Sequence, residues 1–320
     1  MPLPNDPVIG FAHATYRLAE RFAARGTGLR IVEARTREEL ERQLPTLDVL
    51  AVSGLWRNDF AARAPRLVFI QSISAGTEHF DLALLAFRGI RLASARGVNA
   101  EAVAQHGMAM MLAIARRLPE ALRNQDRRHW RGMAANPAAR EDTLRGKTLL
   151  IVGFGRIGSR LGELARAFGM RVIGIRRDPA SGGAGADAVH AFAELPALWG
   201  KADIVALTCA LTAETTRLVD EAAFAVLKPG AWLVNLARGR VVDEAALLQA
   251  LRTGRLAWAA LDVFDNEPLP ADHPLWAMPN VLITPHCAGE FEGYEDGVID
   301  LLLENLSRLR RGEPPINGVV

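Results

Sequence analysis

Short apolar runs alternate with amphipathic stretches along the first third of the chain. The runs predict buried strands at Val8–Ala12, Leu29–Val32, Val49–Val52 and Leu67–Ile70. The stretches between them predict helices at Tyr16–Ala24, Arg37–Gln43 and Asp59–Arg63. Strands that alternate with helices are typical of a parallel sheet covered on both faces. We therefore expect a small open α/β domain here, without a glycine-rich phosphate turn.

The pattern changes in the next segment, where Ala100–Arg117 is expected to form a long helix with one apolar face. Pro119 should end or kink this helix, and a polar helix should continue to about Trp130, before a loop at Met133–Asp142. Later apolar runs predict strands at Arg171–Ile175, Ile204–Leu207, Trp232–Val234, Ala257–Leu261 and Val281–Ile283. Helices are expected between these strands and near the end of the chain, among them Asp243–Arg252 and Glu290–Arg311.

A glycine motif follows the apolar run Leu149–Val152. The motif is Gly153-x-Gly155-x-x-Gly158, and the amphipathic stretch Ser159–Phe168 comes directly after it. The order strand, turn, helix distinguishes a dinucleotide-binding fingerprint from a chance glycine-rich turn. These glycines permit a tight turn, close approach to a pyrophosphate and helix–strand packing, and the helix N-terminus offers N–H groups to phosphates. Because about 145 residues precede the motif, the nucleotide domain comes second or is inserted.

Composition narrows the class of protein. A chain of 320 residues predicts two domains, and 50% hydrophobic with 23% charged residues is typical of a soluble globular protein. The net charge of +2 is too small to indicate a nucleic-acid or membrane partner, and no apolar run is long enough to span a membrane. The basic residues are almost all arginine, and they are scattered among acidic residues.

The two cysteines, Cys209 and Cys287, have no C-x-x-C partner, which favours a reduced, cytoplasmic setting. The N-terminal segment has neither a basic region nor a long apolar stretch, so no signal peptide is expected.

Reactive side chains follow three of the predicted strands. Arg238 follows one strand, Asp262 and Glu267 follow the next, and His286 follows the last. Ligands of open α/β sheets bind beyond the carboxyl ends of the strands. Taken singly, each residue has an ordinary alternative: a strand-capping arginine, turn-forming or solvated carboxylates, and a structural histidine. Their shared position favours a single site.

Hydride transfer to a ketone needs the groups that these segments offer. An acid must protonate the developing alkoxide, and a cation must polarise the carbonyl and hold a carboxylate. His286 can be the acid, with Glu267 orienting the imidazole and stabilising its protonated form. Arg238 can bind a carboxylate with its planar guanidinium. The hydride itself belongs to a nicotinamide cofactor.

These segments resemble the D-isomer-specific 2-hydroxyacid dehydrogenase family, nearest its NADPH-dependent glyoxylate/hydroxypyruvate reductases. The matching motifs are Ile70–Asp81, Asn99–Pro119, the fingerprint, Leu233–Glu244, Ala260–Pro270 and Thr284–Gly289, and they cover nearly the whole chain. The resemblance implies two doubly wound parallel-sheet domains of the α/β class. A Rossmann nucleotide domain, residues 99–287, is inserted into a flavodoxin-like substrate domain, residues 1–98 and 288–320. It further implies hinges at Asn99 and around Cys287–Glu290.

The resemblance also implies roles for individual residues. Arg238, Glu267 and His286 match the catalytic residues. Other matches are substrate-binding Ser74, Ala75 and Gly76, whose backbone N–H groups hold the substrate carboxylate, together with Arg238 and His286. The candidate cofactor-binding residues are Gly153, Gly155, Arg156, Ile157, Gly158, Arg176, Arg177, Cys209, Thr215, Leu236, Ala237, Asp262 and Gly289, with Asp262 holding the nicotinamide carboxamide. No metal site is expected.

The segment Ala100–Trp130 resembles the family's dimer-forming segment, although it could be a plain core helix. Gln105 departs from the family's usual Glu, and no catalytic consequence is expected.

The residues after Val172–Ile175 bear on the choice of cofactor. NAD-dependent proteins place an acid there to bind the ribose 2′-OH, whereas this chain has Arg176 and Arg177. An arginine pair suits a 2′-phosphate, so NADP(H) is the predicted preference and NAD(H) is the alternative. Asp178 could instead fold back onto the ribose.

The substrate is expected to be a small 2-oxoacid such as glyoxylate or hydroxypyruvate. Leu55 and Trp56 are predicted to line its pocket, where Trp56 would either restrict substrate size or stack on a bulkier apolar substrate. Two alternatives remain in the same family: a cofactor-sensing regulator without turnover, and a formate dehydrogenase, against which Glu267 argues because that branch has Gln there.

Overall fold

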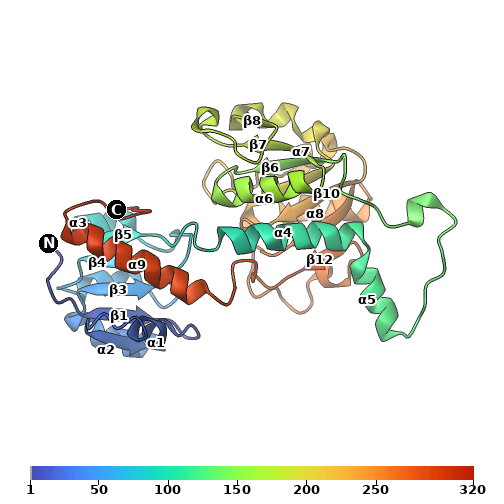
Figure 1. The fold of residues 1–320 in the computed structure, drawn as a ribbon. Coiled ribbons are helices and arrows are strands. Elements are labelled where there is room, and N and C mark those ends of the chain that lie inside the picture. The colour runs from blue at the N-terminus through green and yellow to red at the C-terminus, as the bar shows by residue number, and fades with distance from the viewer. Residues whose placement is uncertain (1) are drawn as a thin grey trace. The chain divides into compact units, whose positions relative to one another are not determined.

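The computed structural model describes residues 2–320, which form two compact units. One unit comprises the chain up to Asn99 together with Phe291–Val320, and the other comprises Ala100–Glu290. Figure 1 follows this course by colour, with the green and yellow segments belonging to the inserted unit. The chain therefore passes between the units after Asn99 and after Glu290, whereas the expected boundaries fell after residues 98 and 287.

Five parallel strands form the sheet of the first unit, in the order β2-β1-β3-β4-β5. They are β1 (Ile9–Ala12), β2 (Ile31–Ala34), β3 (Val49–Val52), β4 (Phe69–Ser72) and β5 (Arg91–Ala93). The central strands β1 and β3 are fully buried, as their unbroken apolar sequences predict. This strand order is that of the flavodoxin-like doubly wound fold, so the predicted fold class is confirmed for this unit.

Helices cover both faces of this sheet. One face carries α1 (Leu18–Ala23) and α9 (Tyr294–Arg310), whose Phe22 and Leu302 are buried in one cluster. The other face carries α2 (Arg37–Gln43), α3 (Leu82–Phe87) and a 3-10 turn at Asn58–Ala62, which share a second cluster. Because α9 comes from the far end of the sequence, it completes this core only after the second unit has been synthesised.

Seven parallel strands form the sheet of the second unit, in the order β12-β11-β10-β9-β6-β7-β8. They are β6 (Thr148–Val152), β7 (Arg171–Ile175), β8 (Ala188–His190), β9 (Ile204–Leu207), β10 (Ala231–Asn235), β11 (Leu256–Leu261) and β12 (Val281–Ile283). This is the Rossmann order, with β12 as a seventh strand. The strand order reverses between β6 and β9, and ligands of such sheets bind at that reversal.

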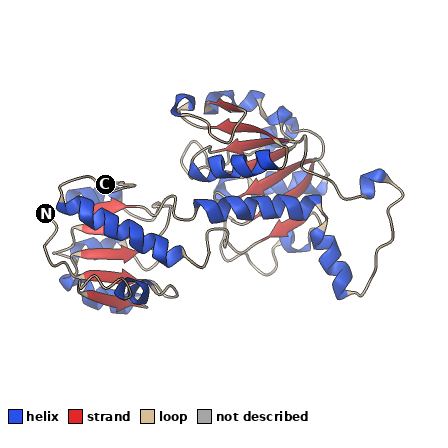
Figure 2. Cartoon of the chain, in the orientation of Figure 1, coloured by secondary structure: helices blue, strands red, loops and turns tan. Residues whose placement is uncertain are grey.

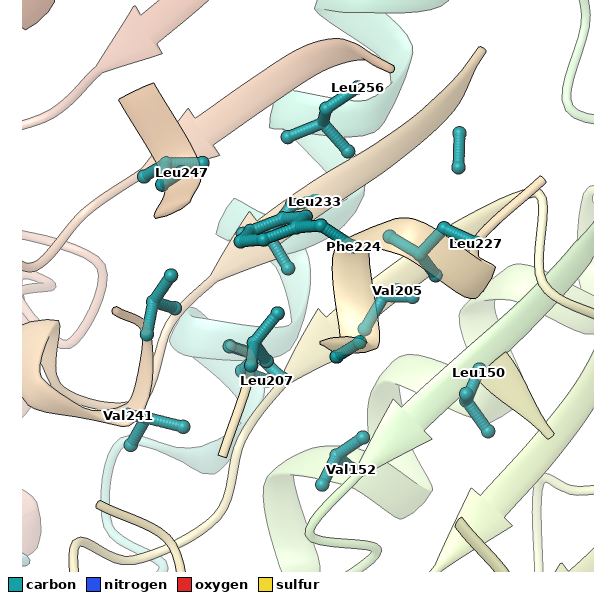
Figure 3. Close-up of a cluster of buried hydrophobic side chains, with 14 of the residues drawn as sticks. Leu150, Val152, Val205, Leu207, Phe224, Leu227, Leu233, Val241, Leu247 and Leu256 are labelled. Carbon is teal, nitrogen blue, oxygen red and sulfur yellow. The ribbon is translucent and has the colours of Figure 1, made fainter. Parts of the chain in front are cut away.

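The helices of the second unit also lie on both faces of its sheet (Figure 2). On one face, α4 (Ala100–Ala115) and α6 (Arg156–Ala167) bury Met111 and Leu161. On the other, α7 (Glu221–Val226) and α8 (Glu244–Arg252) pack Phe224 and Leu247 against the strands, as Figure 3 shows. The remaining helix of this unit, α5 (Leu118–Asp126), buries none of its residues.

Several elements differ from those predicted. The predicted helix Asp59–Arg63 is the 3-10 turn at Asn58–Ala62, and the strand expected at Leu29–Val32 is β2, which begins two residues later. Strands β5 and β8 were not predicted, because their sequences RLA and AVH each include a polar residue, whereas β12, an edge strand of the same length, reads VLI and was predicted. Other 3-10 turns lie at Leu44–Thr46, Pro137–Ala139, Pro179–Ser181, Phe192–Ala197, Trp199–Lys201, Gly239–Val241 and Pro274–Ala277.

The candidate active site

The glycine turn joins β6 to α6 in the second unit, and its three glycines serve different purposes. Gly153 has a φ of 96°, and a Cβ there would clash with the backbone of Cys209. A Cβ on Gly158 would lie 2.8 Å from the carbonyl oxygen of Gly153. Both glycines are therefore required by the packing of the protein itself.

Gly155 is different, because the fold itself does not require a glycine there. It caps the N-terminus of α6, and a Cβ there would meet no atom nearer than 4.0 Å. The turn thus leaves open space above an exposed backbone, at the N-terminus of a twelve-residue helix. A pyrophosphate fits such a cradle, since the free N–H groups and the positive end of the helix dipole face it.

The remaining predicted cofactor residues of this unit lie in the loops that follow its strands. Because all seven strands are parallel, these loops emerge at one edge of the sheet. Arg156 and Ile157 begin α6, Leu236 and Ala237 follow β10, and Gly289 follows β12. After β9, Thr215 is buried and donates to the carbonyl oxygen of Ala210 at 2.7 Å. Burial raises the pKa of Cys209 to about 11, so this thiol stays protonated near neutral pH.

Arginines occupy the end of β7, as predicted. Arg176 donates from Nη1 to the carbonyl oxygen of Gly182 at 2.9 Å, and Arg177 is exposed. Asp178 accepts hydrogen bonds from the amide of Ala180 at 3.1 Å and from the hydroxyl of Ser181. The hydrogen bond from Ser181 lowers the pKa of Asp178, and the carboxylate is held within its own turn.

Arg238 follows β10, and its loop is packed against the loop after β11. Its Nη1 donates to the carbonyl oxygen of Ala237 at 2.7 Å, and its own carbonyl accepts from Asn235 Nδ2 at 3.0 Å. A Cβ on the next residue, Gly239, would clash with the backbone of Phe264. Glycine at 239 therefore lets the Arg238 loop approach the loop that carries Glu267.

Glu267 and His286 are brought together by the loops after β11 and β12. Glu267 Oε2 lies 2.6 Å from His286 Nδ1, and Glu267 Oε1 accepts from the amide of Phe264 at 2.8 Å. Since an ionised carboxylate can only accept a hydrogen bond, we assign a proton to His286 Nδ1. The second ring nitrogen, Nε2, does not take part in this contact. Both side chains are partly exposed, His286 by 47% and Glu267 by 34%, so solvent can reach the pair.

His286 occupies a constrained turn. Its φ is 54°, a left-handed conformation that is uncommon for residues other than glycine, and its amide donates to the carbonyl oxygen of Thr284 at 3.1 Å. Asp262, at the end of β11, is 2% exposed and accepts from the amides of Cys287 at 3.0 Å and Ala288 at 3.1 Å. Residues with an unfavourable backbone conformation, like His286, cluster at functional sites, where contacts such as those of Asp262 must hold them in place.

Sequence reasoning missed two residues of this network. Thr284 donates to Asp262 Oδ1 at 2.6 Å, and its hydroxyl lies 3.0 Å from His106 Nε2 on α4. The TPH sequence could have drawn attention to Thr284, but no local signal marks His106. The potential metal-ligand atoms of His106, Asp262 and Cys287 lie within 4.8 Å of one another. The bonds just described engage the imidazole of His106 and the carboxylate of Asp262, and they involve the backbone amide of Cys287 but not its thiol.

The predicted carboxylate-binding loop of the first unit follows β4. The amide of Ser74 donates to Ser72 Oγ at 3.1 Å. The side-chain oxygen of Ser74 lies 2.6 Å from Ser53 Oγ. Within residues 2–320, the amides of Ala75 and Gly76 donate to no acceptor. Two of the three predicted amides are therefore available to a ligand, while that of Ser74 already has an acceptor.

Trp56 was expected to line the substrate pocket, and the structure places it in the core of the first unit. Its side chain is 5% exposed, its ring packs near Phe60 and Phe80, and its Nε1 donates to Asn58 Oδ1 at 3.0 Å. Leu55 is half-buried beside it. Of the two residues predicted to line the pocket, Leu55 therefore has the more exposed side chain.

Comparison with known proteins places these features in a family. The model for the NAD binding domain of D-isomer specific 2-hydroxyacid dehydrogenases matches residues 108–288. Glyoxylate reductase from Aeropyrum pernix is 37% identical over 271 residues, which cover 82% of this chain and 78% of that protein.

Two solved structures are similar over almost the whole chain. A D-isomer specific 2-hydroxyacid dehydrogenase family protein from Aeromonas salmonicida has a TM-score of 0.86 and 30% identity, covering 99% of both chains. A D-isomer specific 2-hydroxyacid dehydrogenase from Xanthobacter autotrophicus, in complex with NADPH and MES, has a TM-score of 0.80 and 30% identity, covering 98% of both.

These similarities define the class of protein as an oxidoreductase that acts on CH–OH groups with NAD(P). The chain belongs to the D-isomer specific 2-hydroxyacid dehydrogenase family, as its motifs predicted. Within residues 2–320, no helix combines the length and the apolar character needed to cross a bilayer.

Proposed function

We propose that this protein reduces a small 2-oxoacid, such as glyoxylate or hydroxypyruvate, to the D-2-hydroxy acid. The observation that carries the proposal is the contact of 2.6 Å between His286 Nδ1 and Glu267 Oε2, in a family of nicotinamide-dependent dehydrogenases. A histidine held in this way by a carboxylate is suited to deliver a proton from Nε2. The glyoxylate reductases among the similar proteins suggest the size of the substrate.

The proposed mechanism divides the work among three residues. NAD(P)H, held at the glycine turn from Gly153 to Gly158, would supply the hydride for the carbonyl carbon. His286 gives its Nε2 proton to the carbonyl oxygen, so that the 2-oxoacid, the hydride and the proton together yield the 2-hydroxy acid. Glu267 keeps the imidazole oriented and stabilises its positive charge before transfer. Arg238 binds the substrate carboxylate and polarises the carbonyl.

The amides of Ala75 and Gly76 are proposed as a second set of donors to the substrate carboxylate. They belong to the first unit and lack protein acceptors in the described part of the chain. Neighbouring backbone N–H groups in a turn form a concave site for anions.

We propose NADP(H) as the preferred cofactor. Arg176 and Arg177 follow β7, and the carboxylate of Asp178 accepts from the Ala180 amide and the Ser181 hydroxyl within its own turn. The first side chains after the strand are therefore cationic, which favours a 2′-phosphate over a free 2′-OH. The test is Arg176→Asp, which should shift the ratio of kcat/KM for NADPH to that for NADH at least tenfold towards NADH. An unchanged ratio would contradict this assignment.

A homodimer formed through Ala100–Trp130 is also proposed. Helix α5 buries none of its residues, and Leu122 is 61% exposed, Trp130 95% and Met133 102%. Apolar side chains exposed in one region mark an interaction surface. The resemblance and this surface both favour a second copy of the chain as the partner. The cytoplasmic setting stays a prediction from cysteine usage.

The deciding experiment follows the loss of reduced-nicotinamide absorbance with glyoxylate, hydroxypyruvate, pyruvate and phenylpyruvate, each with NADPH and with NADH. Fast turnover with one small oxoacid, abolished by His286→Ala, is the expected result. Turnover with phenylpyruvate alone would favour the alternative of a bulkier substrate. Cofactor binding without turnover on any of the four would favour the alternative of a cofactor-sensing regulator.

A further inference from the structure

A chain of hydrogen bonds links helix α4 to the turn that carries His286. His106 Nε2 lies 3.0 Å from the hydroxyl oxygen of Thr284, and that hydroxyl lies 2.6 Å from Asp262 Oδ1. Asp262 in turn accepts from the amides of Cys287 and Ala288, the two residues after His286. His106 and Thr284 are 178 residues apart in the sequence, so tertiary packing alone brings them together.

The direction of these bonds follows from the protons that are available. Asp262, when ionised, can only accept hydrogen bonds, so the Thr284 hydroxyl must donate its single proton to this carboxylate. The hydroxyl oxygen then has only lone pairs for its other neighbour, and His106 must donate from a protonated Nε2. The hydrogen bonds therefore run from His106 through Thr284 to the Asp262 carboxylate. In such a series each donated bond polarises the next donor and strengthens its bond.

The carboxylate at the end of this chain fixes the catalytic turn. Asp262 is 2% exposed, and a buried carboxylate is tolerated only where donors surround it. Its three bonds, from Thr284 and from the two amides, clamp the segment on both sides of His286. His286 itself has a φ of 54°, a conformation that persists only when neighbouring contacts impose it.

Helix α4 also supports the segment before Arg238. A Cβ on Gly107, the residue after His106, would lie only 2.7 Å from Leu236 Cδ1. Two consecutive residues of α4 thus contact the segments that precede Arg238 and His286. A helix of 16 residues is a rigid base for both.

We propose that His106 is a positioning residue for His286, acting through Thr284 and Asp262. The inference rests on the proposed role of His286 as the acid. His106 touches neither substrate nor reacting atoms in this scheme. Its N–H group keeps the Thr284 hydroxyl aimed at Asp262, which keeps the His286 turn in its strained conformation.

Substitutions at His106 and Thr284 test the proposal. His106→Leu replaces the donor with an apolar side chain of similar size, while His106→Gln offers an N–H at a similar distance from the backbone. Thr284→Val removes the hydroxyl, and Thr284→Ser keeps it. Gln105→Leu is the matched control, because Gln105 is the preceding residue of α4 and its exposed side chain donates to Glu101 at 2.6 Å, on the same helix.

Steady-state kinetics give the first readout. His106→Leu and Thr284→Val should each lower kcat about tenfold, with the KM for the 2-oxoacid within twofold, since misplacing a reacting group slows the chemical step. The solvent deuterium isotope effect on kcat should rise, because proton transfer becomes slower. The double variant should lose little more than either single one, and His106→Gln and Thr284→Ser should restore most of kcat. A plain loss of stability would lower the melting temperature without this pattern.

Alkylation of Cys287 gives a readout that does not depend on turnover. Cys287 is half-buried in the turn, whereas Cys209 is buried. Iodoacetamide labelling of Cys287, followed by peptide mass, should become at least fivefold faster in His106→Leu and stay unchanged in Gln105→Leu. If His286→Ala leaves turnover unaltered, the proposed function fails, and the labelling rates still decide whether His106 holds the turn. Wild-type labelling in His106→Leu, or faster labelling with an unaltered kcat and isotope effect, would overturn the role proposed for His106.

Discussion

Glu267→Gln is the most direct test of the proposed acid–base pair. Glu267 uses Oε1 for the Phe264 amide and Oε2 for His286 Nδ1. The introduced glutamine has a single acceptor oxygen. If that oxygen keeps the bond to Phe264, its –NH2 group faces Nδ1, which must then accept. The imidazole loses its negative partner and is held in the neutral form that carries its proton on Nε2, which is a weaker acid.

The magnitude follows from the contact that is lost. A hydrogen bond to a charged group contributes about 1.5–3 kcal/mol. The side chain of His286 is 47% exposed and that of Glu267 is 34% exposed. Because solvent screens this contact, we take the lower end of that energy range. A loss of about 1.5–2 kcal/mol in the transition state corresponds to a decrease in kcat of about 10- to 30-fold.

The assay is steady-state oxidation of the reduced nicotinamide at saturating 2-oxoacid, with folding checked by the melting temperature. Asp265→Asn is the matched control: it removes an exposed carboxylate from the same loop, where Asp265 pairs with Arg240 at 3.9 Å. We expect wild-type kcat from the control and the 10- to 30-fold loss from Glu267→Gln. A folded Glu267→Gln protein with kcat within twofold of wild type would refute the reasoning.

Two further predictions concern the glycine turn and the exposed helix. Gly153→Ala should lower the free energy of unfolding by about 2–4 kcal/mol in urea titrations, because its positive φ and the clash with Cys209 both oppose a Cβ. Gly155→Ala should leave that free energy within about 1 kcal/mol and weaken NADPH binding by calorimetry, since only the cofactor would meet the new methyl group; equal affinity would place the pyrophosphate elsewhere. Leu122→Asp should convert a dimer to a monomer in light scattering, whereas Gln125→Asp, which adds the same charge at an exposed polar position of the same helix, is the matched control and should change the mass less. A wild-type mass for Leu122→Asp would contradict the proposed interface.

The sequence by itself determined the fold class and the common location of the candidate catalytic residues. Apolar runs that alternate with amphipathic stretches predict parallel sheets, and the glycine motif marks the first strand of the Rossmann unit. Once the strands are parallel, any residue that follows a strand must lie at the same edge. The positions of Arg238, Glu267 and His286 along the chain were therefore enough to predict that they share that edge, and the structure shows Glu267 and His286 in contact. The short edge strand β8 escaped prediction because its sequence AVH has no unbroken apolar run, unlike the VLI of β12.

Only the tertiary structure decided which polar groups are already engaged and which remain available. The amide of Ser74 and the carboxylate of Asp178 are taken up by neighbours, and Trp56 packs into a core, although nothing in their local sequence says so. The bond between His106 and Thr284 spans 178 residues. Such a bond depends on how α4 packs on the face of the sheet, a geometry that the pattern of apolar and polar residues along the chain leaves open.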